Sequence, residues 1–259
     1  GAGRAHPRDR LRNDREYVEG ETITSRIKAG KVTPILQTLD LVEQLCDGLA
    51  HAHSRGIIHR DIKPSNLMVT TEHGRQRLKI LDFGIAKVSD SALTGADNIL
   101  GTMNYMSPEQ LRGSSAIDHR SDIFAVGSVF YEMLSHRRAF PGTVQDGVLA
   151  KIVDQSPEPL SKLVPGLDPE IERIIGTALQ KQPGRRYQDL AAMRRDIRQV
   201  RMRLVQERID SLHEAGRKAF ELGAYEGTLA TCDEILALNP DDARGLALQR
   251  TAREAIARQ

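Results

Sequence analysis

The sequence predicts a mainly α-helical protein that carries one small β-hairpin and ends in a helical hairpin. Three observations lead to this fold class. Apolar residues recur at spacings of three and four along several segments, as they do in amphipathic helices. Two short, β-rich segments flank a turn around Gly74. The last part of the chain reads as a helix, a tight turn and a second helix that a proline ends.

The composition is that of a folded, soluble protein without a strong overall charge. The 259 residues include 37 Lys or Arg and 35 Asp or Glu, so the net charge of +2 gives no reason to expect a nucleic-acid partner. No apolar run approaches the ~20 residues of a membrane span. Cys46 and Cys232 lie far apart in amphipathic segments, which favours buried thiols over a disulfide. We therefore expect a cytoplasmic protein, with no membrane contact within this chain.

The first predicted helix covers Thr33–Arg55 and ends at Gly56, because its apolar residues keep helical spacing up to that glycine. Residues 57–69 then combine short apolar pieces with a polar loop that contains a proline, and a second strand covers Leu78–Leu81. From Asp82 to Glu109 there is little periodicity, which predicts a long loop. A loop of that length inside a compact domain is usually functional or disordered.

Three further helices are predicted after this loop. Ser121–Leu134 is apolar nearly all round, as expected of a helix buried at the centre of a domain. Asp168–Lys181 and Tyr187–Leu204 each repeat apolar residues at spacings of three and four, as amphipathic helices do. The region after the long loop is therefore expected to be mostly helical.

The C-terminal segment Ile209–Ala243 resembles a single tetratricopeptide repeat, because two helices, a tight turn and a terminating proline fill about 34 residues. A plain helical hairpin is the alternative. One repeat cannot bury its own apolar face, so it would pack on the preceding helix or continue beyond the end given. We divide the chain into an Arg-rich tail at residues 1–15, a helical domain at 16–206 and this helical segment at 207–259.

The strongest functional signal is a set of short motifs in a fixed order. Residues 59–66 read HRDIKPSN, residues 82–84 read DFG, and residues 101–109 run from GT to SPE. At these spacings they resemble the catalytic loop, the magnesium-binding motif and the activation segment of the protein kinase family. The wording of the last motif resembles the bacterial serine/threonine branch, several members of which append tetratricopeptide repeats. The resemblance covers residues 16–204 and implies a kinase-like C-terminal lobe.

The resemblance implies that four polar residues carry phosphoryl transfer. Asp61 would accept the proton of the substrate hydroxyl, and Lys63 would lie against the γ-phosphate of ATP. Asn66 and Asp82 would supply ligands for two Mg²⁺ ions, which prefer hard oxygen donors. The alternative, a polar hairpin without a catalytic role, does not explain why four such residues occur together at kinase spacing.

Further residues of the same motifs have structural or regulatory roles by resemblance: His59, Arg60, Phe83, Gly84, Thr94, Thr102, Glu109, Asp122 and Arg186. Asp122 would hold the backbone of the catalytic loop. Arg186 would form a bidentate pair with Glu109 at the end of the activation segment. Thr102 would contact the catalytic aspartate and lysine near the substrate.

Regulation by phosphorylation is a second implication of the resemblance. Arg60, next to the catalytic aspartate, is typical of kinases whose activation loop is ordered by phosphorylation, because the phosphate gives the arginine a partner. Thr94, Ser89 and Ser91 are the candidate sites. For any one of them, an ordinary hydroxyl in a solvated loop is the alternative.

The nucleotide site is only partly represented in the sequence. Residues 16–21 resemble the hinge between the two kinase lobes, where the Glu16 carbonyl and the Val18 amide would meet adenine and Met68 would form the floor. The Gly-rich strand pair, the strand lysine and the helix glutamate that precede this hinge in a kinase do not occur in the sequence. We therefore expect the N-terminal lobe to be absent, residues 1–15 to be unrelated to a kinase, and the fragment to be inactive in isolation.

Three hypotheses follow for the function. The leading one is a segment of an active serine/threonine kinase that uses ATP and Mg²⁺ to phosphorylate protein substrates. The second is a catalytically dead pseudokinase that consists of one lobe and acts as a scaffold, with its repeat-like segment binding a partner protein. The third, a purely structural helical repeat protein, leaves the chemistry of the catalytic loop unexplained.

Overall fold

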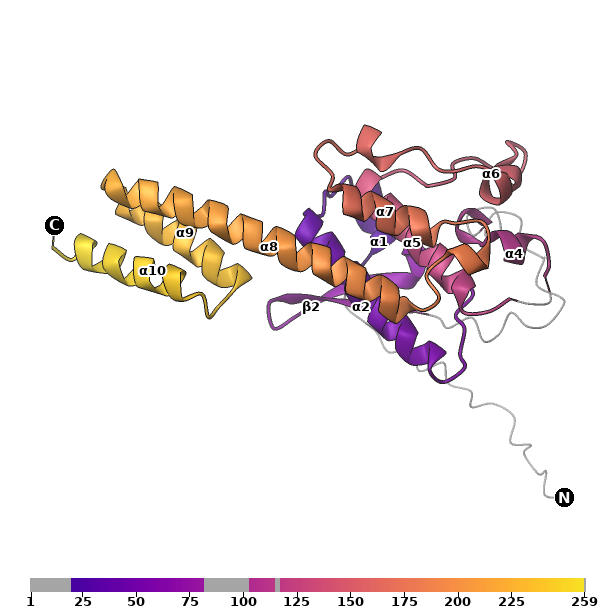
Figure 1. Cartoon of the computed structure of the whole chain (residues 1–259), viewed down its shortest axis with the longest axis horizontal. Helices are drawn as coiled ribbons and strands as arrows, with labels where there is room; N and C mark the ends of the chain where they lie inside the picture. Colours follow the sequence, from indigo (N-terminus) through magenta and orange to yellow (C-terminus); the bar gives the residue numbers. More distant parts are fainter. Residues whose placement is uncertain (1–19, 82–102, 115–116, 259) are drawn as a thin grey trace, which may run out of the picture.

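A computed structural model of the chain describes residues 20–81, 103–114 and 117–258. Figure 1 shows a helical lobe with a small β-sheet, from which a long helical arm projects to one side. The mainly helical class with one small antiparallel sheet is the class that the sequence predicted. Within the described ranges, no helix is both long enough and apolar enough to cross a membrane.

The helices of the described residues follow in chain order. The α-helices are α1 (Ile23–Lys28), α2 (Ile35–His53), α4 (Pro108–Leu111), α5 (Arg120–Ser135), α6 (Val148–Asp154), α7 (Pro169–Ala178), α8 (Leu190–Glu221), α9 (Tyr225–Leu238) and α10 (Ala243–Ile256). The 3-10 helices are η1 (Pro64–Asn66), η3 (Met103–Tyr105), η4 (Leu160–Lys162) and η5 (Pro183–Arg185). Three of the predicted helices, at residues 33–55, 121–134 and 168–181, correspond to α2, α5 and α7.

The sheet is antiparallel and has the strand order β1-β2-β3. β2 (Leu67–Glu72) and β3 (Arg75–Ile80) form the predicted hairpin, with Glu72 opposite Arg75 next to the turn. His73 and Gly74 close it with left-handed backbones, at φ 51° and 75°, as a two-residue type I′ turn requires. β1 (Glu21–Thr22) adds a third strand to the edge of β2. The sequence analysis did not predict it, because two residues carry no periodicity.

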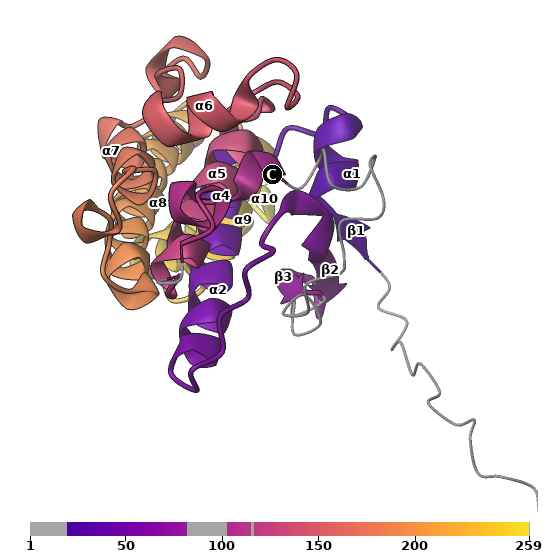
Figure 2. The same cartoon turned by 90° about the vertical axis from the view of Figure 1, so that its right-hand side faces the viewer.

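α5 lies at the centre of the lobe and is buried on nearly every side, as its apolar sequence predicted. It packs against α2 and α7, and α2 in turn packs against α8 and β3. Phe124 and Phe130 of α5 are fully buried, and the Phe124 ring stacks on Phe140 with 5.9 Å between centroids. Figure 2 shows the sheet and α1 on one flank of the lobe, with α7 and α8 on the other. The hairpin is therefore fixed to the helical core through α2.

α8 is longer than predicted. The sequence analysis expected a helix at residues 187–204, but α8 continues without interruption from Leu190 to Glu221. The Asp189 side chain caps its start by accepting a hydrogen bond from the Ala192 amide at 2.6 Å. Because α8 contains no proline, nothing interrupts the helix at residue 206. The proposed boundary between the lobe and the C-terminal segment therefore falls inside α8, and the division into domains stays a prediction.

The arm consists of the second half of α8 together with α9 and α10. α9 packs along α8, and α10 packs on α9 and also contacts α8 (Figure 1). Ile209, Leu212 and Ile235 form a small buried cluster, separate from the main core. Gly245 lies so close to α9 that a Cβ atom there would be 2.9 Å from the Ile235 side chain. The predicted helix, turn and helix are present, and the likeness to a tetratricopeptide repeat stays a prediction.

Candidate active site

The loop at residues 59–66 connects the end of α2 to β2 and is anchored in the core. His59 is fully buried, and Ile62 is 1% exposed. The η1 turn brings the end of the loop back toward its middle, because the Asn66 amide donates to the Lys63 carbonyl at 2.9 Å. The loop therefore folds on itself, with its polar side chains close together.

Three of the four residues predicted to carry phosphoryl transfer meet in this loop. Lys63 Nζ forms an ion pair with Asp61 Oδ2 at 3.1 Å. Asn66 Nδ2 donates to the same Oδ2 at 3.3 Å and to the Asp61 main-chain carbonyl at 2.8 Å. The Asp61 and Lys63 side chains are only 11% and 19% exposed, so their ion pair is largely shielded from water. The fourth residue, Asp82, lies outside the described residues.

Asp122, in the first turn of α5, holds the backbone of this loop. Its carboxylate is buried and accepts hydrogen bonds from the His59 amide at 2.9 Å and the Arg60 amide at 2.8 Å. Arg60 has a left-handed backbone, with φ 64°. Such a conformation is unusual for a residue with a Cβ atom and persists only where its surroundings hold it. The Asp122 carboxylate provides part of that support.

His59 links the loop to the residue that precedes the predicted magnesium-binding motif. Its Nδ1 accepts a hydrogen bond from the Asp61 amide at 3.3 Å, so the hydrogen is on Nε2, which donates to the Leu81 carbonyl at 3.3 Å. Burial lowers the pKa of His59, which favours this neutral form. The Leu81 amide also donates to the Asn66 carbonyl at 2.8 Å. Two hydrogen bonds therefore hold the chain next to Asp82 beside the loop.

Two residues that contact this region were not predicted. His53, in the last turn of α2, places its Nε2 2.8 Å from Asp122 Oδ2, and its ring lies 5.4 Å from that of His119. Gln110 of α4 donates from Nε2 to the Arg60 carbonyl at 3.1 Å. His53 and Gln110 lie 69 and 50 residues from these partners in the sequence. No local pattern could have identified them, because only the tertiary fold brings the partners together.

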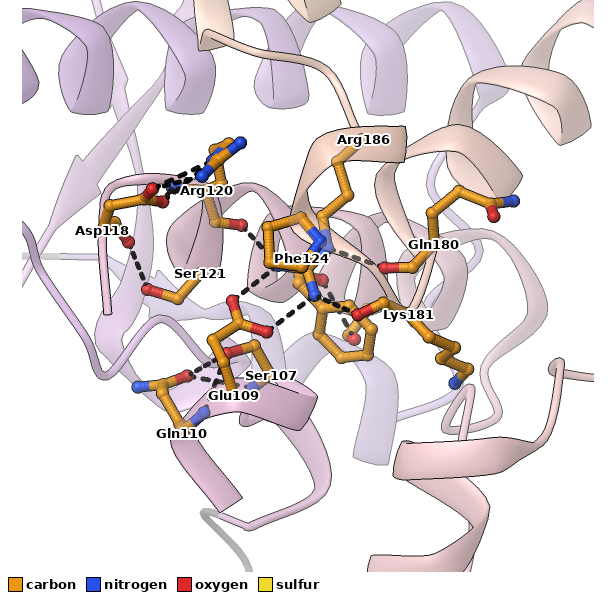
Figure 3. Close-up of polar contacts among 12 residues, drawn as sticks. Ser107, Glu109, Gln110, Asp118, Arg120, Ser121, Phe124, Gln180, Lys181 and Arg186 are labelled. Carbon is orange, nitrogen blue, oxygen red and sulfur yellow. Dashed lines mark hydrogen bonds and ion pairs between the residues drawn. The ribbon is translucent and has the colours of Figure 1, made fainter. Parts of the chain in front are cut away.

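Arg186 and Glu109 form a buried bidentate ion pair (Figure 3). Arg186 Nη1 and Nη2 donate to the two Glu109 carboxylate oxygens at 2.7 and 2.8 Å. The guanidinium also donates to three main-chain carbonyls, those of Arg120, Gln180 and Lys181. Burial alone would raise the pKa of Glu109, but hydrogen bonds, chiefly from Arg186, hold it below its ordinary value. The pair joins α4 to the segment that precedes α8.

The segment before α4 is fixed to the lobe by a second buried contact. The Tyr105 hydroxyl of η3 donates to Glu132 Oε2 of α5 at 2.5 Å. Burial raises the pKa of both Tyr105 and Glu132. Asn104 also donates to the Phe140 carbonyl at 2.9 Å. Residues 104 and 105 are therefore fixed to the lobe, one through the Phe140 main chain and the other through the Glu132 side chain.

Of the predicted nucleotide-binding residues, only Met68 is described. It lies on β2, half-buried, opposite Thr22, and a Cβ atom on Gly20 would be 2.9 Å from its Cγ. The chain that follows the predicted hinge therefore passes directly over Met68. The other predicted residues that lie outside the described part of the chain are Glu16, Val18, Asp82, Phe83, Gly84, Ser89, Ser91, Thr94 and Thr102.

Comparison with known proteins identifies a family that matches this chain. The family described as protein kinase domain matches residues 13–196. Serine/threonine-protein kinase PknB of Mycobacterium leprae (strain TN) is 37% identical over 187 residues, which are 71% of this chain and 29% of that protein. PknB of Mycobacterium tuberculosis (strain ATCC 25618 / H37Rv) is 36% identical over 189 residues, with the same two shares.

A relative from another genus gives the same result. The probable serine/threonine-protein kinase SCO3848 of Streptomyces coelicolor is 37% identical over 185 residues, which are 70% of this chain and 27% of that protein. The chain thus matches less than a third of the length of these relatives. The matched region contains the loop at residues 59–66 and the Glu109–Arg186 pair.

Proposed function

Because this chain belongs to the protein kinase family, we propose that it is an enzyme of the serine/threonine branch and transfers the γ-phosphoryl group of ATP to serine or threonine hydroxyls of proteins. The observation that carries this proposal is that Lys63 and Asn66 both contact Asp61. Lys63 Nζ and Asn66 Nδ2 each lie 3.3 Å or less from an oxygen of Asp61. A carboxylate, an ammonium group and an amide oxygen are the groups that phosphoryl transfer requires.

Asp61 is the general base of the proposed reaction. As the substrate oxygen bonds to the γ-phosphorus, the bond from that phosphorus to the leaving oxygen of ADP breaks, and the hydroxyl proton passes to the Asp61 carboxylate. Lys63, held 3.1 Å from Asp61, is a compact cation that can balance the charge on the transferring group. These residues act by position and charge, which is most of what phosphoryl transfer needs from a protein.

The residues that are present fit Mg²⁺. Asn66 uses its Nδ2 on Asp61, so its Oδ1 is the atom that would serve as a ligand. Hydrogen bonds to Asn66 and His59 hold Leu81 beside the loop, and we propose the residue that follows it in the sequence, Asp82, as the second ligand. Asn and Asp oxygens are hard donors of the kind that Mg²⁺ prefers. When bound, the ion would neutralise charge on the phosphates of ATP.

The test is Asp61→Asn in the full-length protein, with phosphate transfer to a library of serine and threonine peptides as the readout. The variant should lose about 10²- to 10⁴-fold in turnover, because the base is removed, while ATP binding is retained. Asp154→Asn, at an exposed position, is the matched control and should keep full turnover. Turnover equal to the unchanged protein in Asp61→Asn would disprove the role of Asp61.

The pseudokinase scaffold is the competing proposal, and an ATP titration separates the two. If Asn66 and Asp82 hold Mg²⁺ against the phosphates of ATP, ATP affinity should depend on Mg²⁺. An affinity that does not change with Mg²⁺ would favour the scaffold. We further propose that the isolated chain is inactive without an N-terminal lobe over the nucleotide, because positioning of the reactants supplies about 7–11 kcal/mol of barrier reduction.

The arm formed by α8, α9 and α10 is proposed to bind a partner protein in the manner of helical repeats. Support comes from α10, which packs on both preceding helices as the first helix of a next repeat would. The close approach at Gly245 makes this packing specific. A cytoplasmic location is part of the same proposal. Loss of partner capture on deletion of α9 and α10, with the lobe still folded, is the expected result, and unchanged capture would contradict it.

A further inference from the structure

Arg60 and Asp61 share a peptide group that is held at both of its polar atoms. The Arg60 carbonyl accepts from Gln110 Nε2 at 3.1 Å, and the Asp61 amide donates to His59 Nδ1 at 3.3 Å. Because a peptide group is planar, fixing these two atoms fixes the orientation from which the Asp61 side chain departs. The Arg60 amide on the preceding peptide is bonded to Asp122 at 2.8 Å. Arg60, the left-handed residue, is therefore held at its amide by α5 and at its carbonyl by α4.

The side chain of Gln110 uses both ends of its amide group. Its Oε1 accepts from the Ser107 amide at 2.9 Å and from Ser107 Oγ at 3.1 Å, while Ser107 Oγ accepts from the Gln110 amide at 3.4 Å (Figure 3). This is the capping box of α4. A backbone amide can only donate, so the oxygen of Gln110 must face Ser107. The NH₂ group is therefore the end that faces the Arg60 carbonyl.

Residue 110 has two roles, the cap of α4 and the contact with Arg60, and only the second requires glutamine. Capping boxes accept either Glu or Gln at this position, because only the oxygen is needed. Only Gln also carries a donor, and the donor is the group that reaches the catalytic loop. The cap alone gives no reason for glutamine, whereas the contact with Arg60 does.

We propose that Gln110 is a positioning residue that connects the end of the activation segment to the catalytic loop and fixes the peptide that orients Asp61. Through this contact, the placement of α4 determines whether the strained backbone of Arg60 keeps its conformation. The inference rests on the proposed role of Asp61 as the base. Gln110 itself acts through the main chain of Arg60 and does not touch the reacting atoms.

The experiment compares backbone amide exchange, followed by NMR on the whole chain, in Gln110→Glu and in Ser107→Ala. Gln110→Glu keeps the capping oxygen and removes the donor, so exchange at the Arg60 and Asp61 amides should become about two- to tenfold faster. The amides of Leu111 and of the α4 cap residue Arg112, which donate to the Ser107 and Pro108 carbonyls, should be unchanged. Ser107→Ala weakens the cap but keeps the Gln110 donor, so exchange should accelerate more at the α4 amides than at Arg60 and Asp61.

A neutral variant separates the lost donor from the added charge. Gln110→Met has similar length without hydrogen-bonding groups, and it should also accelerate exchange at Arg60 and Asp61. Unchanged exchange at these two amides in both variants, or acceleration confined to α4, would overturn the proposal.

Turnover provides an independent readout in the full-length protein. Gln110→Glu should lower kcat with little change in the KM for ATP, because the nucleotide contacts are not altered. If Asp61→Asn kept its turnover, the proposed function would fail while the exchange result at Arg60 still stood. If the exchange rates did not respond, the positioning role would fail whatever the outcome for Asp61.

Discussion

Replacement of Arg186 by methionine tests how much the buried ion pair stabilises the lobe. The Arg186 side chain is 0% exposed and makes two hydrogen bonds to Glu109 and three to main-chain carbonyls. Methionine fills similar space but leaves the Glu109 carboxylate buried without its cation. Removing one partner of a buried pair costs about 3–5 kcal/mol, out of a total stability of about 5–15 kcal/mol.

Thermal unfolding followed by circular dichroism measures this effect. For a chain of 259 residues, a loss of about 3–5 kcal/mol should lower the Tm by roughly 6–20 °C. Arg173→Met is the matched control, because Arg173 also forms two ion pairs, with Glu170 and Asp196, but is 50% exposed. Exposed pairs contribute about 0–1 kcal/mol, so this variant should shift the Tm by only a few degrees.

The pH dependence gives the same prediction a second test. The folded-state pKa of Glu109 is below its ordinary value, so the pair stabilises the fold above the ordinary glutamate pKa and loses this effect as pH falls through the lower value. The destabilisation by Arg186→Met should therefore be largest near neutral pH and shrink in acid. A loss below about 1 kcal/mol at neutral pH, or one as small as that of Arg173→Met, would refute the reasoning.

Three further predictions concern the arm, a buried lysine and the loop anchor. Gly245→Ala should destabilise the arm by about 1–3 kcal/mol in urea unfolding, since its Cβ would be 2.9 Å from the Ile235 side chain. Gly227→Ala is the control: its Cβ would have no neighbouring atom of the described residues within 4 Å, so it should be neutral or stabilising in the same assay. Burial, and then the charge of Arg186, lower the pKa of Lys181 to about 8, so its contribution to stability should improve as pH rises from about 8 to 10.5; a ¹³Cε NMR titration with a midpoint near 10.5 would contradict this. Asp122→Ala leaves two backbone donors of the loop without their acceptor and should cost about 2–5 kcal/mol in urea unfolding, and a cost below 1 kcal/mol would show that Asp122 does not hold the loop.

The features that the sequence predicted are those that local pattern encodes. α5 was evident from residues that are apolar all round, and the β2–β3 hairpin from its turn at Gly74. The meeting of Asp61 with Lys63 and Asn66 followed from a resemblance within one short loop.

The features that it missed depend on residues distant in the sequence. β1 exists only because β2 provides an edge for pairing. The length of α8 was underestimated because the spacing of its apolar residues changes where the helix leaves the lobe and enters the arm. The contact of His53 with Asp122 has no signature in the sequence, since histidines near helix ends are common and the partner lies on another helix.

The loop at residues 59–66 therefore depends on other parts of the lobe for its conformation. A helix as short as α4, at Pro108–Leu111, cannot be stable by itself. The free-energy cost of forming the first turn exceeds what the hydrogen bonds of four residues contribute. Its capping box and two adjacent side chains hold it in place: Glu109 reaches Arg186, and Gln110 reaches the carbonyl of Arg60. Arg186 lies 77 residues beyond Glu109, so the contact that holds α4 forms only when the lobe is assembled. Because α4 supports Arg60, the left-handed backbone before Asp61 also depends on the whole lobe.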